Sequence, residues 1–149
     1  MKSNLKLVHE SGDANLLQAK LGSGIRDYAF EKKGHKPIEA FAISIRNEND
    51  EIKGGCNGAV YYGCLYVDQL WIKKEFRHQG LGKQLMNAAE ILGKGKGCLF
   101  STVNTMDWEA LDFYKKLGYF VEFERKGYHK NSVFYFLRKD FTEIELGKT

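Results

Sequence analysis

The residues best suited to chemistry lie in a short glycine-rich stretch, Arg77-His-Gln-Gly80-Leu-Gly82. This stretch follows an apolar segment, residues 65–72, and runs directly into a helical pattern over residues 81–92. A strand that turns through glycines into a helix brings free backbone N–H groups and the positive end of a helix dipole together, an arrangement that suits a pyrophosphate. The pattern therefore indicates a nucleotide-type cofactor.

Two better-known phosphate-binding motifs do not fit this stretch. The dinucleotide fingerprint needs a third glycine where Leu85 stands, and a P-loop needs serine or threonine after its lysine, whereas glutamine follows Lys83. Gly80 and Gly82 allow close approach to a phosphate and positive φ at little cost. The alternative is that they only make a tight strand-to-helix connection beside Arg77, a solvated charge.

Composition limits the remaining possibilities. A chain of 149 residues is predicted to form one domain, residues 1–149, and its 43% hydrophobic content supports a packed core. The sequence contains no apolar stretch long enough to span a bilayer and does not begin with a signal peptide, so we expect a cytoplasmic protein without a membrane partner. A net charge of +4 is mild, which argues against a nucleic-acid partner.

The cysteines and histidines do not form a recognisable reactive or metal-binding pattern. The three cysteines, Cys56, Cys64 and Cys98, are odd in number and lack metal-ligand spacing. We interpret them as non-catalytic thiols in a reducing compartment. The four histidines are scattered, so we expect no metal.

The secondary-structure pattern predicts a mixed α/β (α+β) sheet with flanking helices. Strands are predicted over residues 41–46, 52–62, 65–72, 98–103, 120–124 and 133–138, the first two and the last two as antiparallel hairpins. Helices are predicted over residues 13–20, 25–33 and 81–92, the last of these ending at Gly93. A fourth helix, capped by Asp107 and ended by Gly118, presents Ala110, Phe113, Tyr114 and Leu117 on one face. This order is unlike a doubly wound array.

The chain resembles the GNAT superfamily of N-acetyltransferases. Arg77-His-Gln-Gly80-Leu-Gly82 resembles its pyrophosphate signature, Arg/Gln-x-x-Gly-x-Gly/Ala. Ala110-Leu-Asp-Phe-Tyr114-Lys-Lys-Leu-Gly118-Tyr resembles its second signature, Ala-x-x-Phe-Tyr-x-x-x-Gly-Phe/Tyr. The resemblance implies a mostly antiparallel sheet of about six to seven strands, flanked by helices and splayed at the fourth strand.

The resemblance also implies a reaction and its partners. Acetyl-CoA would be the co-substrate, with no metal, and the acceptor would be a primary amine of a small molecule or peptide that attacks directly. The protein would be a monomer or homodimer. The cofactor-binding residues implied by the motifs are Leu70, Trp71, Ile72, Arg77, His78, Gln79, Gly80, Leu81, Gly82, Lys83, Asn104 and Tyr114.

Two residues are candidates for proton transfer. Tyr114 stands where many relatives place the general acid that protonates the departing thiolate, although a core aromatic residue is the alternative. Asp68 lies inside the most apolar strand, where a desolvated carboxylate suits a general base. A strand-end or ion-paired aspartate is the alternative for Asp68. Other carboxylates are weaker candidates: Glu39, Glu122 and Glu124.

The sequence departs from the family pattern at two positions. His78 stands where most relatives have glycine, and Asp107 stands where many have asparagine, so Asn104 is considered for the amide contact instead. The acceptor site is expected to involve residues 16–33 and 126–131. A non-catalytic acyl-CoA-binding or sensing module remains the alternative function.

Overall fold

The computed structural model describes residues 4–12 and 14–141. The chain forms two compact units, Met1–Pro37 and Ile38–Thr149. In the described part of the first unit, α1 spans Asn15–Lys33 and ends at Gly34, whose positive φ of 68° lets its N–H bond to Phe30 O at 2.8 Å. None of the described helices is both long and apolar enough to cross a membrane.

The prediction of two separate N-terminal helices was wrong. The expected break falls inside α1, because Gly22 and Gly24 continue the helix. A glycine inside a helix costs about 1 kcal/mol relative to alanine, which weakens the helix without ending it. The expected helix start, Asp13, lies outside the described residues.

The second unit is built on a six-stranded sheet in the order β1-β2-β3-β4-β6-β5. The strands are β1 (Glu39–Arg46), β2 (Ile52–Tyr61), β3 (Cys64–Ile72), β4 (Phe100–Met106), β5 (Phe120–Arg125) and β6 (Phe134–Asp140). Every neighbouring pair is antiparallel except β3 and β4, which run parallel. The predicted sheet and both predicted hairpins are confirmed.

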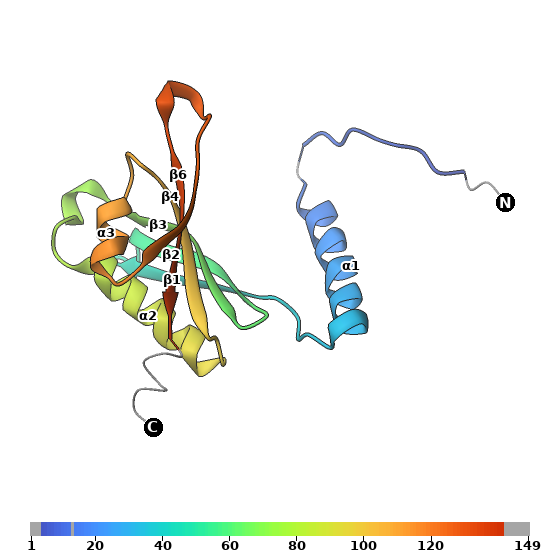
Figure 1. Cartoon of the computed structure of the whole chain (residues 1–149), viewed down its shortest axis with the longest axis horizontal. Helices are drawn as coiled ribbons and strands as arrows, with labels where there is room; N and C mark the ends of the chain where they lie inside the picture. Colours follow the sequence, from blue (N-terminus) through green and yellow to red (C-terminus); the bar gives the residue numbers. More distant parts are fainter. Residues whose placement is uncertain (1–3, 13, 142–149) are drawn as a thin grey trace. The chain divides into compact units, whose positions relative to one another are not determined.

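Helices cover one face of this sheet. α2 (Leu81–Gly95) makes the crossover between the parallel strands β3 and β4, and the short α3 (Leu111–Lys116) lies on the same side (Figure 1). Short 3-10 helices occupy Lys74–Phe76 and His129–Asn131. α2 buries Leu85, Met86 and Ala89 against inner-face residues of the strands, so its helical spacing of apolar residues serves the core.

Two of the three residues predicted to mark helix boundaries, Gly93 and Asp107, do not have that role. Gly93 does not end α2: it is buried within the helix, where a Cβ would lie 3.1 Å from the Leu65 side chain. Its role is close helix–sheet packing. Asp107 does not cap α3, which begins at Leu111; instead its carboxylate accepts the Val133 N–H at 3.1 Å. The predicted glycine after α3, Gly118, is confirmed by its φ of 96°.

A buried polar network joins α2 to the sheet. Glu90 is 5% exposed, and its carboxylate accepts hydrogen bonds from Lys139 Nζ at 2.8 Å and from the Tyr119 hydroxyl at 3.0 Å. The Tyr119 hydroxyl also lies 2.8 Å from Ser101 Oγ. Because a buried charge left without its partner typically costs about 3–5 kcal/mol, this network fixes the position of α2.

Candidate active site

The sheet opens between its two parallel strands. Pairing joins only Cys64–Val67 of β3 to Phe100–Val103 of β4. Beyond this point β3 continues alongside β2 alone, and β4 continues alongside β6. The strands therefore diverge, as predicted, and no strand among residues 4–12 and 14–141 pairs with this edge of β3 from Asp68 onward.

A cleft of about 1170 Å³ occupies this opening. It brings together nearly all the residues predicted to bind the cofactor: Leu70, Trp71, Ile72, Arg77, His78, Gly80, Leu81, Gly82, Lys83, Asn104 and Tyr114. Gln79 is exposed and is not among the residues that line the cleft. Segments far apart in the sequence thus meet around one volume.

One end of the cleft is formed by the start of α2. The first backbone bond of this helix runs from Gln84 N to Gly80 O at 3.1 Å, and no side chain caps the helix. The N–H groups of residues 81–83 precede that bond and have no partner within the helix. With the helix dipole, they provide donors for an anion.

The two glycines of this turn have different roles. Gly80 has a φ of 79°, and a Cβ there would meet nothing within 4 Å. Gly82 lies inside α2 and does not have a positive φ. A Cβ at Gly82 would lie 3.1 Å from the Phe113 ring, so this glycine allows α3 to pack closely. His78, where glycine is usual in the motif, has a left-handed φ of 62°.

Arg77 ties the turn to the end of β3. Its Nε donates a hydrogen bond to Ile72 O at 2.8 Å, while the residue as a whole is exposed. One edge of the guanidinium thus holds the loop in place. Within the described part of the chain, the terminal nitrogens form no ion pair and can donate to an anion.

Tyr114 belongs to both the core and the cleft. It is 6% exposed, and its ring makes edge contacts with Phe113 at 5.1 Å and Tyr119 at 5.9 Å between centroids. Burial, followed by the negative charge of Glu109, raises the pKa of Tyr114 to about 12. The hydroxyl is therefore protonated at neutral pH and is a hydrogen-bond donor.

Asp68 does not have the buried environment expected of it. It is exposed, and it is the extra residue of a bulge in β3, since Asn57 pairs with Gln69 and the next residue of β2, Gly58, pairs with Val67. The Tyr66 hydroxyl donates a hydrogen bond to Asp68 Oδ1 at 3.2 Å, and Asn104 Nδ2 lies 3.5 Å from that hydroxyl. Desolvation, followed by the negative charge of Asp68, raises the pKa of Tyr66.

Asp68 lines two neighbouring pockets. It lines the cleft and a shallower depression of about 530 Å³, whose floor includes Ala40, Ala42 and Ala59. Sequence reasoning missed the part played by Tyr66. Its spacing of two residues from Asp68 places both on one face of a strand, which was the available signal.

The three cysteines are free and buried. Burial raises the pKa of each thiol, at Cys56, Cys64 and Cys98. None of them is among the residues that line the cleft. These properties fit the interpretation of inert thiols.

A sheet opened between parallel strands, with an uncapped helix start at one end of the gap, defines the architecture of a transferase that binds an acyl-CoA. The model of the acetyltransferase (GNAT) family matches residues 15–119. The chain belongs to this family.

Curated relatives and solved structures agree with this assignment. Blasticidin-S acetyltransferase of Streptomyces morookaense is 38% identical over 56% of this chain, although the match covers only 62% of that protein. Acetyltransferase Atu2258 of Agrobacterium fabrum is 29% identical over 71% of this chain and 80% of its own. Both relatives are named as acetyltransferases, which agrees with the family assignment.

Two solved structures show the same fold. An Agrobacterium tumefaciens protein described as an acetyltransferase matches with a TM-score of 0.80 and 25% identity, covering 92% of this chain and 99% of its own. The PaiA N-acetyltransferase of Thermoplasma acidophilum, solved with coenzyme A, matches with a TM-score of 0.57 and 19% identity over 69% of this chain and 62% of its own.

Proposed function

We propose that the protein transfers the acetyl group of acetyl-CoA to a primary amine of a small molecule or peptide by direct attack. The observation that carries the proposal is the continuous lining of one cleft. It extends from the N-terminus of α2 along the free edge of β3 to the Tyr114 side chain. The pyrophosphate, the pantetheine arm and the thioester would each meet groups of matching chemistry along it.

The residues present fit such a co-substrate. The uncapped N–H groups of residues 81–83, with Arg77 and Lys83, would hold the pyrophosphate. The unpaired edge of β3 around Leu70 would hydrogen-bond the pantetheine arm as an added strand. A backbone N–H of that edge would stabilise negative charge on the thioester oxygen.

Tyr114 would act on the leaving group. Bound acetyl-CoA supplies the acyl thioester, and the departing sulfur needs a donor. The protonated Tyr114 hydroxyl, kept neutral by burial, is such a donor within the cleft. Sulfur is a fair leaving group without help, so the contribution is on the order of 10²-fold.

Asp68 would receive the amine. Its exposure makes it an anchor for an ammonium group and an acceptor for the proton that must be lost before attack. The Tyr66 hydroxyl holds one oxygen of this carboxylate at 3.2 Å. Other candidate carboxylates have partners elsewhere: Glu39 pairs with Lys96 and Glu122 with Arg138. Glu124 pairs in turn with Lys126.

The test is a thiol-release assay with acetyl-CoA and a panel of amines, alongside calorimetry with CoA. Turnover that depends on an added amine supports the proposal. Tight CoA binding without turnover on any amine would favour the acyl-CoA-binding or sensing module instead. A single domain over residues 1–149, a cytoplasmic location and a monomeric or homodimeric state remain predictions.

A further inference from the structure

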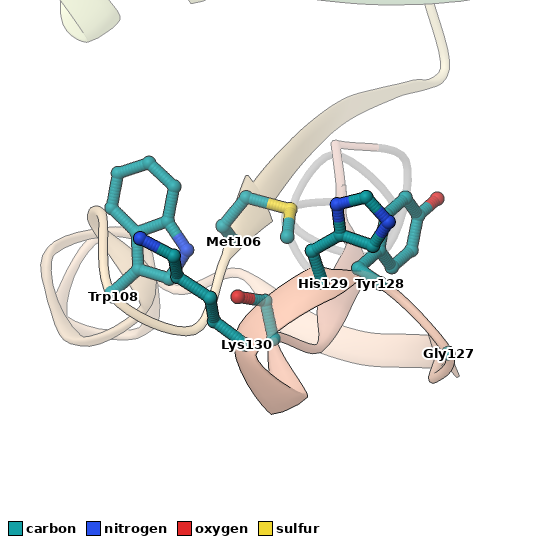
Figure 2. A pocket seen from close by; sticks show the side chains of 7 residues that line it. Met106, Trp108, Gly127, Tyr128, His129 and Lys130 are labelled. Atoms are coloured by element: carbon teal, nitrogen blue, oxygen red, sulfur yellow. The ribbon is translucent and has the colours of Figure 1, made fainter.

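A second cavity lies beside the cofactor cleft. It has a volume of about 810 Å³ and is lined chiefly by Met106, Trp108, Tyr128, His129, Lys130 and Ser132. Figure 2 shows Trp108 and Lys130 on one side, His129 and Tyr128 on the other, and Met106 between them. Trp108 lines both this cavity and the cleft, so the two spaces lie side by side at this residue.

The walls of this cavity are held in place by other elements. The Asp107 N–H donates to Val133 O at 2.8 Å, and the Asp107 carboxylate accepts the Val133 N–H at 3.1 Å. These bonds fix the turn that carries Trp108 to the start of β6. The Tyr128 ring packs edge-on against Phe134 with centroids 5.8 Å apart. The cavity is therefore preorganised for a ligand.

The lining combines aromatic surface with basic groups. Trp108 is 70% exposed, an unusual state for a large aromatic side chain outside a binding surface. Lys130 contacts the same space, and within the described residues it forms no ion pair, whereas Lys126 of the same loop lies 3.6 Å from Glu124. His129 adds an imidazole that can donate a hydrogen bond.

The loop backbone that places Lys130 at this cavity has an unfavourable conformation. Lys130 and Asn131 have consecutive left-handed φ angles of 59° and 56°. Left-handed conformations are unfavourable for lysine and are retained where the surroundings impose them. Within the described residues neither Asp107 nor Glu109 forms an ion pair with Lys130; their carboxylates accept the Val133 N–H and the Met106 N–H, at 3.1 and 2.9 Å.

We propose that this cavity binds the non-reacting end of the acceptor, and that this end is a planar ring carrying an anionic group such as a carboxylate. The inference rests on the proposed function, because the amine of the same molecule would reach past Trp108 into the cleft. The ring would stack on Trp108, and Lys130 with His129 would bind the anion. Polyamines and lysine-rich peptides would be repelled by the same cation.

A matched pair of amines tests this proposal. 4-(Aminomethyl)benzoate and 4-(aminomethyl)benzamide share the amine and the ring and differ in charge. We expect kcat/KM to favour the benzoate by about tenfold, the effect of one exposed charge-assisted hydrogen bond. Lys130→Asn removes the cation and suits the left-handed backbone, so it should bring the ratio close to one. Lys126→Asn is the control and should preserve the preference.

A binding measurement separates failure of this inference from failure of the proposed function. Calorimetry with the two amines in the presence of CoA should show the same tenfold preference and the same loss in Lys130→Asn. Preferential binding without turnover would refute acetyl transfer and support the ligand class. Turnover without a preference, or a preference that survives Lys130→Asn, would overturn the inference.

Discussion

Replacing Tyr114 by phenylalanine removes a proton donor from the cleft and keeps the aromatic ring in the core. Burial raises the pKa of this tyrosine to about 12, whereas a thiol has a pKa of about 8.5. Complete proton transfer to the departing thiolate would therefore be uphill by about 5 kcal/mol. The hydroxyl acts chiefly by donating a hydrogen bond, so we expect Tyr114→Phe to lower kcat by about tenfold to a hundredfold.

The same substitution has a second, independent effect on stability. An unfolded tyrosine loses its proton near pH 10, and native Tyr114 keeps its proton until about pH 12. Within that window the unfolded state binds fewer protons, so the wild-type protein loses stability as the pH rises. The loss reaches about 1.4 kcal/mol per pH unit, or about 2.7 kcal/mol in total. The Tyr114→Phe variant has no hydroxyl at this position, so it does not show this pH-dependent loss of stability.

Two assays measure these effects on turnover and on stability. Steady-state thiol release and CoA calorimetry should show a lower kcat with nearly unchanged CoA affinity. Urea unfolding at pH 9 and pH 11 should show the variant gaining about 1.4 kcal/mol relative to wild type at the higher pH. An unchanged kcat would make Tyr114 a packing residue only. If the difference in unfolding free energy between the variant and the wild type is the same at pH 9 and pH 11, the burial argument is refuted.

Three further substitutions test the site. Gly82→Asp should weaken CoA binding by at least a hundredfold in calorimetry, since it adds negative charge and crowds Phe113 at 3.1 Å; unchanged affinity would contradict the assigned phosphate site. Asp68→Asn should lower kcat/KM for amines about tenfold without altering CoA affinity, and Asp50→Asn, in the β1–β2 turn, should have no effect. His78→Gly should raise the unfolding free energy by up to about 1 kcal/mol because it relieves the left-handed φ of 62°, whereas His78→Ala should not.

The order of elements and the main cleft residues were predictable because their signals are local. The turn from β3 into α2 and the alternation of the strands are visible in short windows of sequence. The pairing of Arg77 with Ile72 O was not predictable, although Arg77 was singled out, because a guanidinium that binds phosphate and one that braces a loop have the same sequence signal.

The errors came from contacts between distant segments. Gly93 looked like a helix end because its packing against Leu65 cannot be read from its neighbours. Asp107 looked like a helix cap because its true partner, Val133, lies 26 residues further along the chain, at the start of the neighbouring strand β6. Asp68 looked like a regular strand residue because the bulge that leaves it without a partner shows only in the pairing of β3 with β2. The cavity beside Trp108 depends on the same long-range pairing.

The short parallel seam between β3 and β4 has a consequence for local unfolding. Only Cys64–Val67 pair with Phe100–Val103, so this seam joins two antiparallel three-stranded blocks, β1-β2-β3 and β4-β6-β5. Amides along the free edge of β3 beyond Val67 should exchange with solvent sooner than those of β2–β3. A bound pantetheine arm that pairs with this edge would slow their exchange. The opening proposed to admit acetyl-CoA is thus also where the two blocks are least joined, and a bound pantetheine arm would couple them into one cooperative unit.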